Sequence, residues 1–289
     1  MEIKIKTPAK INLTLEIVNK RPDGFHNIQS VMQMIDLYDY LTISTKKADK
    51  NSINLSGTSS EIPYNEKNLA YKAAKVFFDC LYQKNYIDFD KQYETNIFIE
   101  KNIPISAGLA GGSTNAAGTI YGLNKLFNDV LSKEEMHELC GGLGSDLNVC
   151  LEGGCLLATS RGEIIEPLPF KKYSVSLIKP TNLGISAKEA YTKYSQLVNK
   201  PNYDMTHKLI DALKIGTNIE QFIYNDLETA VFDDYKELQE IKKDYPKSIM
   251  SGSGSTYFML NNSFKNADGY WVRNNLNFIS HGVIEDSIK

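Results

Sequence analysis

The chain has 289 residues, of which 42% are hydrophobic and 23% charged, so its length suggests two domains or one large one with a substantial core. Its 17 Tyr and 12 Phe exclude an intrinsically disordered chain, because that many aromatic side chains bury enough surface to offset the entropy lost on folding. The 32 basic and 35 acidic residues give a net charge of −3, which argues against general nucleic-acid binding.

Cysteine and histidine are too few and too scattered to predict a metal site. Cys80, Cys140, Cys150 and Cys155 form no Cys-x-x-Cys pair, so we expect free, mostly buried thiols. The first six residues alternate charged and apolar side chains and lack the apolar core of a signal peptide. A long uncharged stretch, residues 102–124, is too rich in Gly, Ser, Thr and Asn for a membrane span. We therefore expect a cytoplasmic protein that does not bind membranes.

Hydrophobic periodicity predicts both strands and helices in the first half of the chain. Alternating or short apolar runs predict strands at residues 3–6, 11–17, 41–44, 53–55 and 95–100. Apolar residues at three- and four-residue steps predict helices at residues 68–82 and 112–127. The pattern Ser132-x-x-Glu135 is a capping box, which predicts a third helix running to about Cys140.

Helical segments predominate in the second half. Buried strands are predicted at residues 155–159 and 175–178, and a further strand at residues 256–260. Helices are predicted at residues 187–197, 205–214, 233–243 and 267–276. The chain contains no internal repeat, and this order of elements indicates an α+β fold with two lobes that meet between residues 155 and 175.

The most informative segment runs from Pro104 to Gly118, with the sequence PISAGLAGGSTNAAG. A glycine-rich turn between a strand and a helix lets backbone N–H groups approach an anion, and the helix start adds unpaired N–H donors. The segment lacks the Gly-Lys-Ser/Thr of a Walker A loop and the Gly-x-Gly-x-x-Gly of dinucleotide folds and protein kinases. A phosphate-binding loop and a tight packing turn both remain open on this segment alone.

Three other segments are each weak signals. Lys10 begins a predicted buried strand, although most strand-edge lysines are simply solvated. Residues 250–256 form a second Gly/Ser loop before a strand, which also suits a flexible hairpin. Asp146, among glycines and apolar residues, is either a helix N-cap or a catalytic carboxylate.

In this order the segments resemble the three motifs of the GHMP small-molecule kinase superfamily: Pro8-Ala-Lys10, the loop at 104–118 and the loop at 250–256. Within it, the chain is similar over nearly its whole length to the family of 4-diphosphocytidyl-2-C-methyl-D-erythritol kinases. The most specific stretch is Lys20-Arg-Pro-Asp-Gly-Phe-His26, and the resemblance continues through Leu143-Gly-Ser-Asp146 and Gly162-Glu163.

The resemblance implies a two-lobed fold and a kinase activity. Residues 1–160 would form an ATP-binding lobe like domain 2 of ribosomal protein S5, and residues 161–289 a ferredoxin-like lobe that contributes to substrate binding. The activity implied is ATP-dependent phosphorylation of the 2-hydroxyl of 4-diphosphocytidyl-2-C-methyl-D-erythritol in the non-mevalonate isoprenoid pathway. ATP would be the phosphate donor, with Mg²⁺ on its phosphates and no metal ligand assigned in the protein.

The same resemblance implies roles for individual residues. Lys10 and Asp146 match the catalytic pair, and Gly252, Ser253 and Gly254 match the glycine-rich third motif. The residues implied for ATP binding are Pro104, Ile105, Ser106, Ala107, Gly108, Leu109, Ala110, Gly111, Gly112, Ser113, Thr114, Asn68 and Lys101. The residues implied for binding the cytidylyl substrate are Asn12, Phe25, His26 and Tyr191.

The chain departs from the family pattern at three places. Ala187 stands where Thr is common, residues 147–149 read Leu-Asn-Val, and Ala110 replaces a frequent Gly. These departures leave open a GHMP-type kinase that acts on a different small alcohol. A non-catalytic nucleotide-binding module is the other alternative, because a fold alone does not fix an activity. The expected partners are small molecules only, with the chain a monomer or a weak homodimer.

Overall fold

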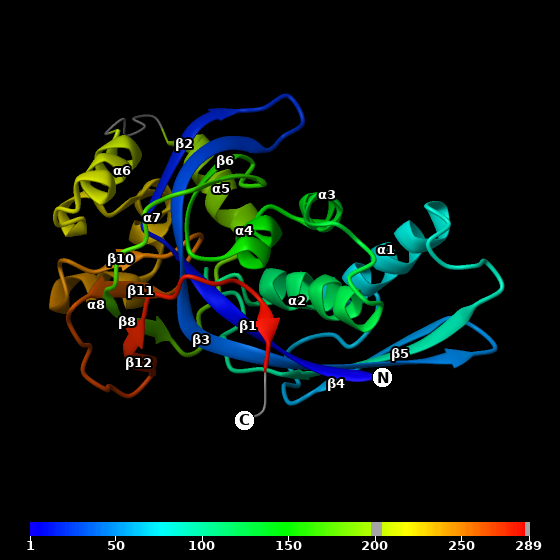
Figure 1. The fold of residues 1–289 in the computed structure, drawn as a ribbon. Coiled ribbons are helices and arrows are strands. Elements are labelled where there is room, and N and C mark those ends of the chain that lie inside the picture. The colour runs from blue at the N-terminus through cyan, green and yellow to red at the C-terminus, as the bar shows by residue number, and fades with distance from the viewer. Residues whose placement is uncertain (198–203, 287–289) are drawn as a thin grey trace.

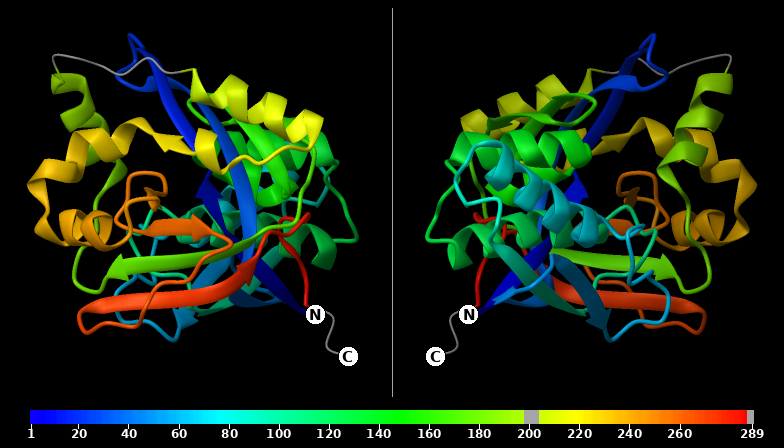
Figure 2. Two further views of the ribbon diagram at one scale, coloured as in Figure 1. Left: turned by 90° about the vertical axis from the view of Figure 1, so that its left-hand side faces the viewer. Right: turned by 90° about the vertical axis from the view of Figure 1, so that its right-hand side faces the viewer.

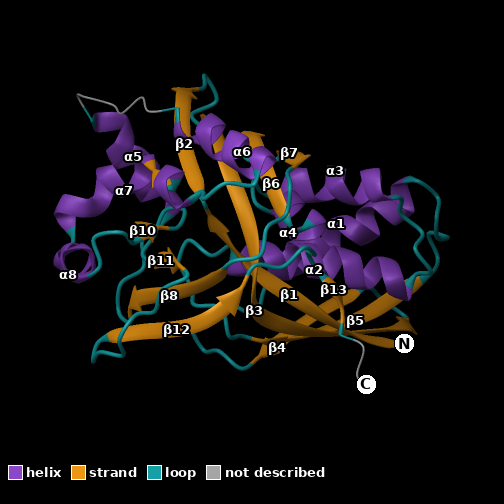
Figure 3. Ribbon diagram, turned by 60° about the vertical axis from the view of Figure 1, so that its left-hand side comes forward, coloured by secondary structure: helices purple, strands orange, loops and turns teal. Residues whose placement is uncertain are grey.

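A computed structural model describes residues 1–197 and 204–286. One group of helices covers the larger sheet on the right, and most of the other helices lie near the smaller sheet on the left (Figures 1 and 3). Nine strands form the larger sheet: β1 (Glu2–Asn12), β2 (Thr14–Lys20), β3 (His26–Ala48), β4 (Ser52–Gly57), β5 (Gln92–Glu100), β6 (Cys155–Ser160), β7 (Ile164–Pro167), β9 (Tyr224–Asn225) and β13 (Ile284–Glu285). Four form the smaller sheet: β8 (Ser174–Pro180), β10 (Ile249–Met250), β11 (Tyr257–Leu260) and β12 (Tyr270–Asn277).

Eight α-helices flank these sheets in the described residues. The first group is α1 (Leu69–Gln83), α2 (Gly111–Leu126), α3 (Lys133–Leu143) and α4 (Leu147–Glu152). The second group is α5 (Ala187–Gln196), α6 (Met205–Ile215), α7 (Asp226–Val231) and α8 (Lys236–Asp244). Two short 3₁₀ turns, Glu220–Phe222 and Phe232–Asp234, precede β9 and α8.

The long strand β3 organises the larger sheet. Its first part pairs with β2 and β6, and its second part pairs with β1 and β5. A register shift between Pro8 and Ala9 marks an irregularity in the pairing of β1 with β3. The C-terminal segment returns to this sheet, since β13 pairs with β1, and Figure 2 shows the two side by side.

Buried apolar side chains form three separate layers. Helices α1, α2 and α4 pack on one face of the larger sheet, where Ile5, Phe77 and Ile120 are fully buried. A second layer, which includes Ile11 and Leu177, joins the two sheets and takes in α6. A third layer packs α5, α7 and α8 on the outer face of the smaller sheet. The α+β class is confirmed.

Local sequence signals fix several helix ends. Asn68 caps α1 through its side chain, which accepts a hydrogen bond from the Ala70 N–H. Ser132 and Glu135 form the predicted capping box at the start of α3. Ser186 caps α5 in the same manner, with its hydroxyl accepting from the Glu189 N–H.

One predicted helix is wrong. The segment predicted as a helix at residues 267–276 is the strand β12, which begins after a left-handed turn at Gly269 and pairs with β8. Tyr270, Trp271 and Val272 favour a strand, and the exposure of the side chains alternates from Arg273 onward. The predicted strand at residues 41–44 lies within the much longer strand β3, which begins at His26 and ends at Ala48.

The predicted division at residues 160 and 161 stays a prediction, although the larger sheet also takes in β7, β9 and β13 from beyond that point. All four cysteines are unpaired and buried, as expected. In the described residues no helix has the length and apolar character to cross a bilayer.

Candidate active site

A cleft of about 1130 Å³ collects most of the residues singled out in the sequence. Its walls come from β1, the turn between β2 and β3, the loop before α2, the start of α4, and α5. Of the residues predicted to form the site, three are absent from its lining: Ser113, Thr114 and Gly254. The others line it together, including the loop from Pro104 to Gly112.

The loop before α2 turns through three residues with positive φ: Ser106 (49°), Gly108 (74°) and Ala110 (59°). Ala110 precedes α2 and makes no side-chain cap hydrogen bond to the N–H groups of the first turn. Gly112 is exposed there. Backbone N–H groups and the positive end of the helix dipole therefore face the cleft, where they suit a phosphate.

The second Gly/Ser loop supports the first. Ser251 accepts a hydrogen bond from the Asn12 N–H (3.2 Å) and donates its hydroxyl to the Gly108 carbonyl (3.0 Å). A Cβ on Gly108 would lie 1.9 Å from the Ser251 carbonyl oxygen, so only glycine fits this contact. Ser251, Ser255 and Thr256 are fully buried, which excludes the flexible hairpin considered for residues 250–256.

Lys10 and Asp146 meet in the cleft. The Lys10 Nζ lies 3.5 Å from Asp146 Oδ2. Lys10 is 3% exposed, so it is not a solvated strand-edge lysine, and its backbone N–H donates to the Leu109 carbonyl in the glycine-rich loop. Asp146 stands at the start of α4, but its carboxylate makes no cap hydrogen bond. The N-cap alternative is therefore excluded, and the carboxylate is directed toward the ammonium.

Lys101 and Asn68 line the same cleft, and both also make contacts that hold the surrounding structure in place. The Lys101 Nζ lies 2.7 Å from Asp39 Oδ2, and both side chains are buried. Burial lowers the pKa of Lys101, while Asp39 opposes that shift. The Asn68 amide caps α1 and also donates to the Pro63 carbonyl. Asp39 was not predicted, because nothing in the sequence joins it to a lysine 62 residues away.

Three aromatic side chains, Phe25, His26 and Tyr191, also line the cleft and are called the aromatic wall here. Phe25 is 52% exposed, and the Arg161 guanidinium lies 5.2 Å from the centre of its ring. His26 and Tyr191 stack on each other at 5.2 Å, so no base can lie between those two rings. The His26 Nε2 lies 3.0 Å from the Ser195 hydroxyl. Burial raises the pKa of Tyr191, which keeps its hydroxyl neutral.

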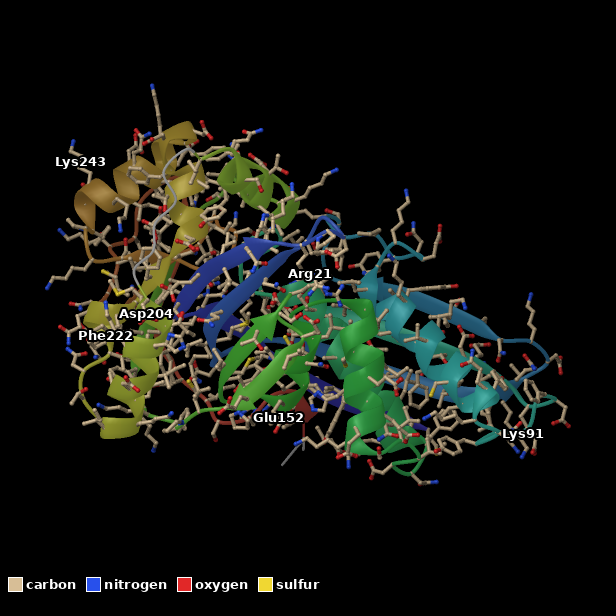
Figure 4. The ribbon with its side chains drawn as sticks, turned by 90° about the horizontal axis from the view of Figure 1, so that it is seen from above. Arg21, Lys91, Glu152, Asp204, Phe222 and Lys243 are labelled. Atoms are coloured by element: carbon tan, nitrogen blue, oxygen red, sulfur yellow. The ribbon has the colours of Figure 1, made fainter. Side chains whose placement is uncertain are left out.

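The Arg-Pro-Asp-Gly turn itself is held by Arg21. Its guanidinium pairs with Asp23 and donates to Asn27 and to the Ser160 hydroxyl. Figure 4 places Arg21 between Lys91 and Lys243, which lie toward opposite ends of the molecule. The hydrogen bond from Arg21 to Ser160 joins the turn to the end of β6, next to Arg161.

The charge of the cleft is opposite to that of the chain. Asp146 is the one acidic residue among its lining residues, whereas five are basic: Lys10, Lys20, Lys101, Lys188 and Arg161. Lys20, Lys188 and Arg161 were missed because isolated charges in a sequence do not differ from ordinary surface charges. A basic cleft in a protein of net charge −3 suits anionic ligands.

Comparison with known proteins agrees with this geometry. Residues 68–154 match the family model of the GHMP kinases N terminal domain. The chain is 38% identical over 265 residues to the 4-diphosphocytidyl-2-C-methyl-D-erythritol kinase of Clostridium perfringens, covering 89% of this chain and 88% of that protein. It is 36% identical over 266 residues to the enzyme of the same name from Geobacillus kaustophilus, covering 90% and 88%.

Solved structures share the fold. A crystal structure of 4-(cytidine 5'-diphospho)-2C-methyl-D-erythritol kinase superposes with a TM-score of 0.70 at 25% identity, covering 97% of this chain and all of that one. Homoserine kinase from Cytophaga hutchinsonii has a TM-score of 0.73 at 16% identity, covering 98% and 97%, and this likeness concerns the fold alone. The chain belongs to the 4-diphosphocytidyl-2-C-methyl-D-erythritol kinase family, among the GHMP kinases.

Proposed function

We propose that this protein transfers the γ-phosphoryl group of ATP to the 2-hydroxyl of 4-diphosphocytidyl-2-C-methyl-D-erythritol, giving the 2-phosphate and ADP in the non-mevalonate isoprenoid pathway. The observation that carries the proposal is the Lys10–Asp146 pair, which lies in the same basic cleft as the open N-terminus of α2. An acid–base pair beside a phosphate-binding helix start is the machinery that an alcohol kinase requires.

In the reaction, the substrate hydroxyl oxygen forms a bond to the γ-phosphorus while the bond to the oxygen bridging to the β-phosphate breaks, and ADP leaves. Asp146 orients the hydroxyl and accepts its proton, an effect typically worth about 10²–10⁴-fold. The Lys10 ammonium, 3.5 Å away, stabilises negative charge that develops on the attacking and transferred oxygens.

The nucleotide binds at the loop from Pro104 to Gly112. The first turn of α2 receives the phosphates, and Ser113 and Thr114 stand in that turn. The Gly252–Gly254 loop acts indirectly, because Ser251 holds Gly108 in place. Lys101 and Asn68, which line the same cleft, contact the nucleotide in this proposal.

The cytidine end of the substrate binds at the aromatic wall. Phe25 offers an exposed ring face for base stacking, and His26 and Tyr191 form the surface beside it. Lys20, Lys188 and Arg161 supply positive charge for the substrate's diphosphate. Ala187 lines this end without the hydroxyl that Thr provides in related proteins, so the backbone and these charges supply the polar contacts.

Mg²⁺ fits this cleft as an ion that arrives with the nucleotide. The described residues contain no group of three or more His, Cys, Asp or Glu that could cage a metal. Mg²⁺ is usually held by one or two carboxylates together with substrate phosphates, and Asp146 is the carboxylate in the lining. When bound, the ion would supply charge neutralisation at the phosphates.

We also propose a cytoplasmic location and a monomeric or weakly dimeric state, with no membrane or nucleic-acid partner. Four unpaired, buried cysteines suit a reducing compartment. A net charge of −3 disfavours nucleic acid, because phosphate neutralisation needs a basic surplus outside the cleft.

ADP release measured with a coupled assay tests the proposed function. The protein is supplied with Mg·ATP and with 4-diphosphocytidyl-2-C-methyl-D-erythritol, mevalonate or homoserine in parallel. Of the three alcohols, we expect only the cytidylyl substrate to be turned over. In Tyr191→Ala we expect a higher KM for that substrate. Faster turnover with either of the other alcohols, or none with all three, would contradict the proposal.

A further inference from the structure

The Lys10 ammonium has two polar neighbours in the cleft. Its Nζ lies 2.5 Å from Asn12 Oδ1 and 3.5 Å from Asp146 Oδ2. Lys10 and Asn12 stand two residues apart on β1, so their side chains project from the same face of the strand. Both residues are almost fully buried. The position of the ammonium therefore depends on how the Asn12 amide is oriented.

Ser30 fixes that orientation. The Asn12 Nδ2 donates to Ser30 Oγ (2.8 Å), and Ser30 Oγ donates to the Thr14 carbonyl (2.5 Å). A hydroxyl has one proton, and Ser30 donates it to the Thr14 carbonyl. Toward Asn12, therefore, the Ser30 hydroxyl can act only as an acceptor. The reversed amide would set its NH₂ group against the ammonium and its oxygen against a hydroxyl with no proton left to donate.

Thr14, whose carbonyl accepts the Ser30 proton, is itself held in place through its side chain. The Thr14 hydroxyl accepts from the Val31 N–H (3.0 Å) and from the Thr206 hydroxyl (2.9 Å). Ser30 and Thr14 are fully buried, so water does not compete for these bonds. The chain of contacts Thr14–Ser30–Asn12–Lys10 thus ends at the ammonium beside Asp146.

We propose that Ser30 is a positioning residue for phosphoryl transfer, which fixes the Asn12 amide so that its oxygen holds the Lys10 ammonium beside Asp146. This inference rests on the proposed function. Asn12 then acts through Lys10, because its oxygen and its nitrogen already bond within the protein. Without the Ser30 hydroxyl the amide can rotate, and the ammonium loses the oxygen that holds it.

The first test compares Ser30→Ala with Ser176→Ala. Ser176 is a matched control, since it is 2% exposed and donates to the Asn262 carbonyl in the smaller sheet, away from the cleft. We expect kcat to fall about 10- to 100-fold in Ser30→Ala, with the KM for ATP within about twofold of the wild type. Ser176→Ala should keep the wild-type kcat at a similar loss of stability. A normal kcat in Ser30→Ala, or equal losses in both variants, would overturn the inference.

Ser30→Ala combined with Asn12→Ala separates positioning from a general structural effect. If Ser30 acts through Asn12, the double variant is no slower than Asn12→Ala alone, whereas independent effects would multiply. A crystal structure of Ser30→Ala adds a readout that needs no turnover: we expect the Lys10 ammonium displaced from Asp146, and an unchanged pair would refute the inference. Failure of the wild type to use the cytidylyl substrate would instead count against the proposed function.

Discussion

Ala110 has a left-handed backbone (φ 59°, ψ 27°) at the start of α2, where a Cβ is sterically unfavourable. The strain of an L-residue in this region is about 1–2 kcal/mol, and glycine relieves it at an entropic cost of about 0.4–1 kcal/mol in the unfolded chain. We therefore expect Ala110→Gly to raise the free energy of unfolding by up to about 1 kcal/mol.

Urea unfolding measures this change, with Ala116→Gly as the control. Ala116 is buried inside α2, so its replacement should destabilise the protein by about 1 kcal/mol or more. If Ala110→Gly were as destabilising as Ala116→Gly, positive φ at residue 110 would be refuted.

The four thiols should be unreactive in the folded protein. Burial raises the pKa of Cys140 and of Cys155 to about 12, and it also raises the pKa values of Cys80 and Cys150. At pH 8 a thiol of pKa 12 is ionised to about one part in 10⁴, and the thiolate is the reactive form. We expect Ellman's reagent to label no cysteine rapidly at pH 8, and all four in guanidinium. Rapid labelling of the native chain would contradict this burial.

At the scale of the element, two loops from distant parts of the chain form one support for the phosphate site. A Cβ on Gly108 would strike the Ser251 carbonyl, whereas a Cβ on Gly142 in α3 meets nothing within 4 Å. We expect Gly108→Ala to lower kcat/KM for ATP about 10²-fold or more, because a shift of about 1 Å in a binding loop is enough. Gly142→Ala should keep wild-type activity and gain about 0.5–1 kcal/mol in stability. Equal kinetics in the two variants would show that the loops do not depend on each other.

Elements with a local signal were predicted well, and those set by distant partners were not. The capping box at Ser132 and the periodicity of α1 lie within one segment of sequence, so both were found. The residues of β12 carry a local preference for a strand at Tyr270, Trp271 and Val272, but their apolar spacing also suits a helix, and only the pairing with the distant β8 decides between the two. The predicted strand at residues 11–17 crosses the break between β1 and β2, and β1 also includes residues 7–10, where no strand was predicted.

The residues of the candidate site also fall into those with a local sequence signal and those without one. Motif order pointed to Lys10, Asp146 and the glycine-rich loop because these residues lie in recognisable short segments. Ser30 and Asp39 carry no such signal, since each becomes a site residue only when β3 lies beside β1 and the segment after β5. The Phe25 and His26 turn was identifiable in the sequence, but its junction with Arg161 depends on β6 pairing with β3.

At the scale of the whole molecule, a mildly acidic protein encloses a basic cleft whose lining comes from both groups of helices as well as from the larger sheet. The larger sheet supplies Lys10 from β1, Asp146 stands at the start of α4, and the aromatic wall combines the turn between β2 and β3 with Tyr191 of α5. Residues from both halves of the chain are needed to complete the cleft, which joins a phosphate-binding helix start to a surface suited to a base.

The most direct measurement of the central claim is single-turnover phosphoryl transfer by Asp146→Asn, together with ATP binding by calorimetry. The amide keeps the size of the carboxylate but cannot accept the proton. We predict that transfer to the cytidylyl substrate slows by about 10²–10⁴-fold, while the Kd for ATP changes by no more than about threefold. Transfer at the wild-type rate by the Asn variant would contradict the account.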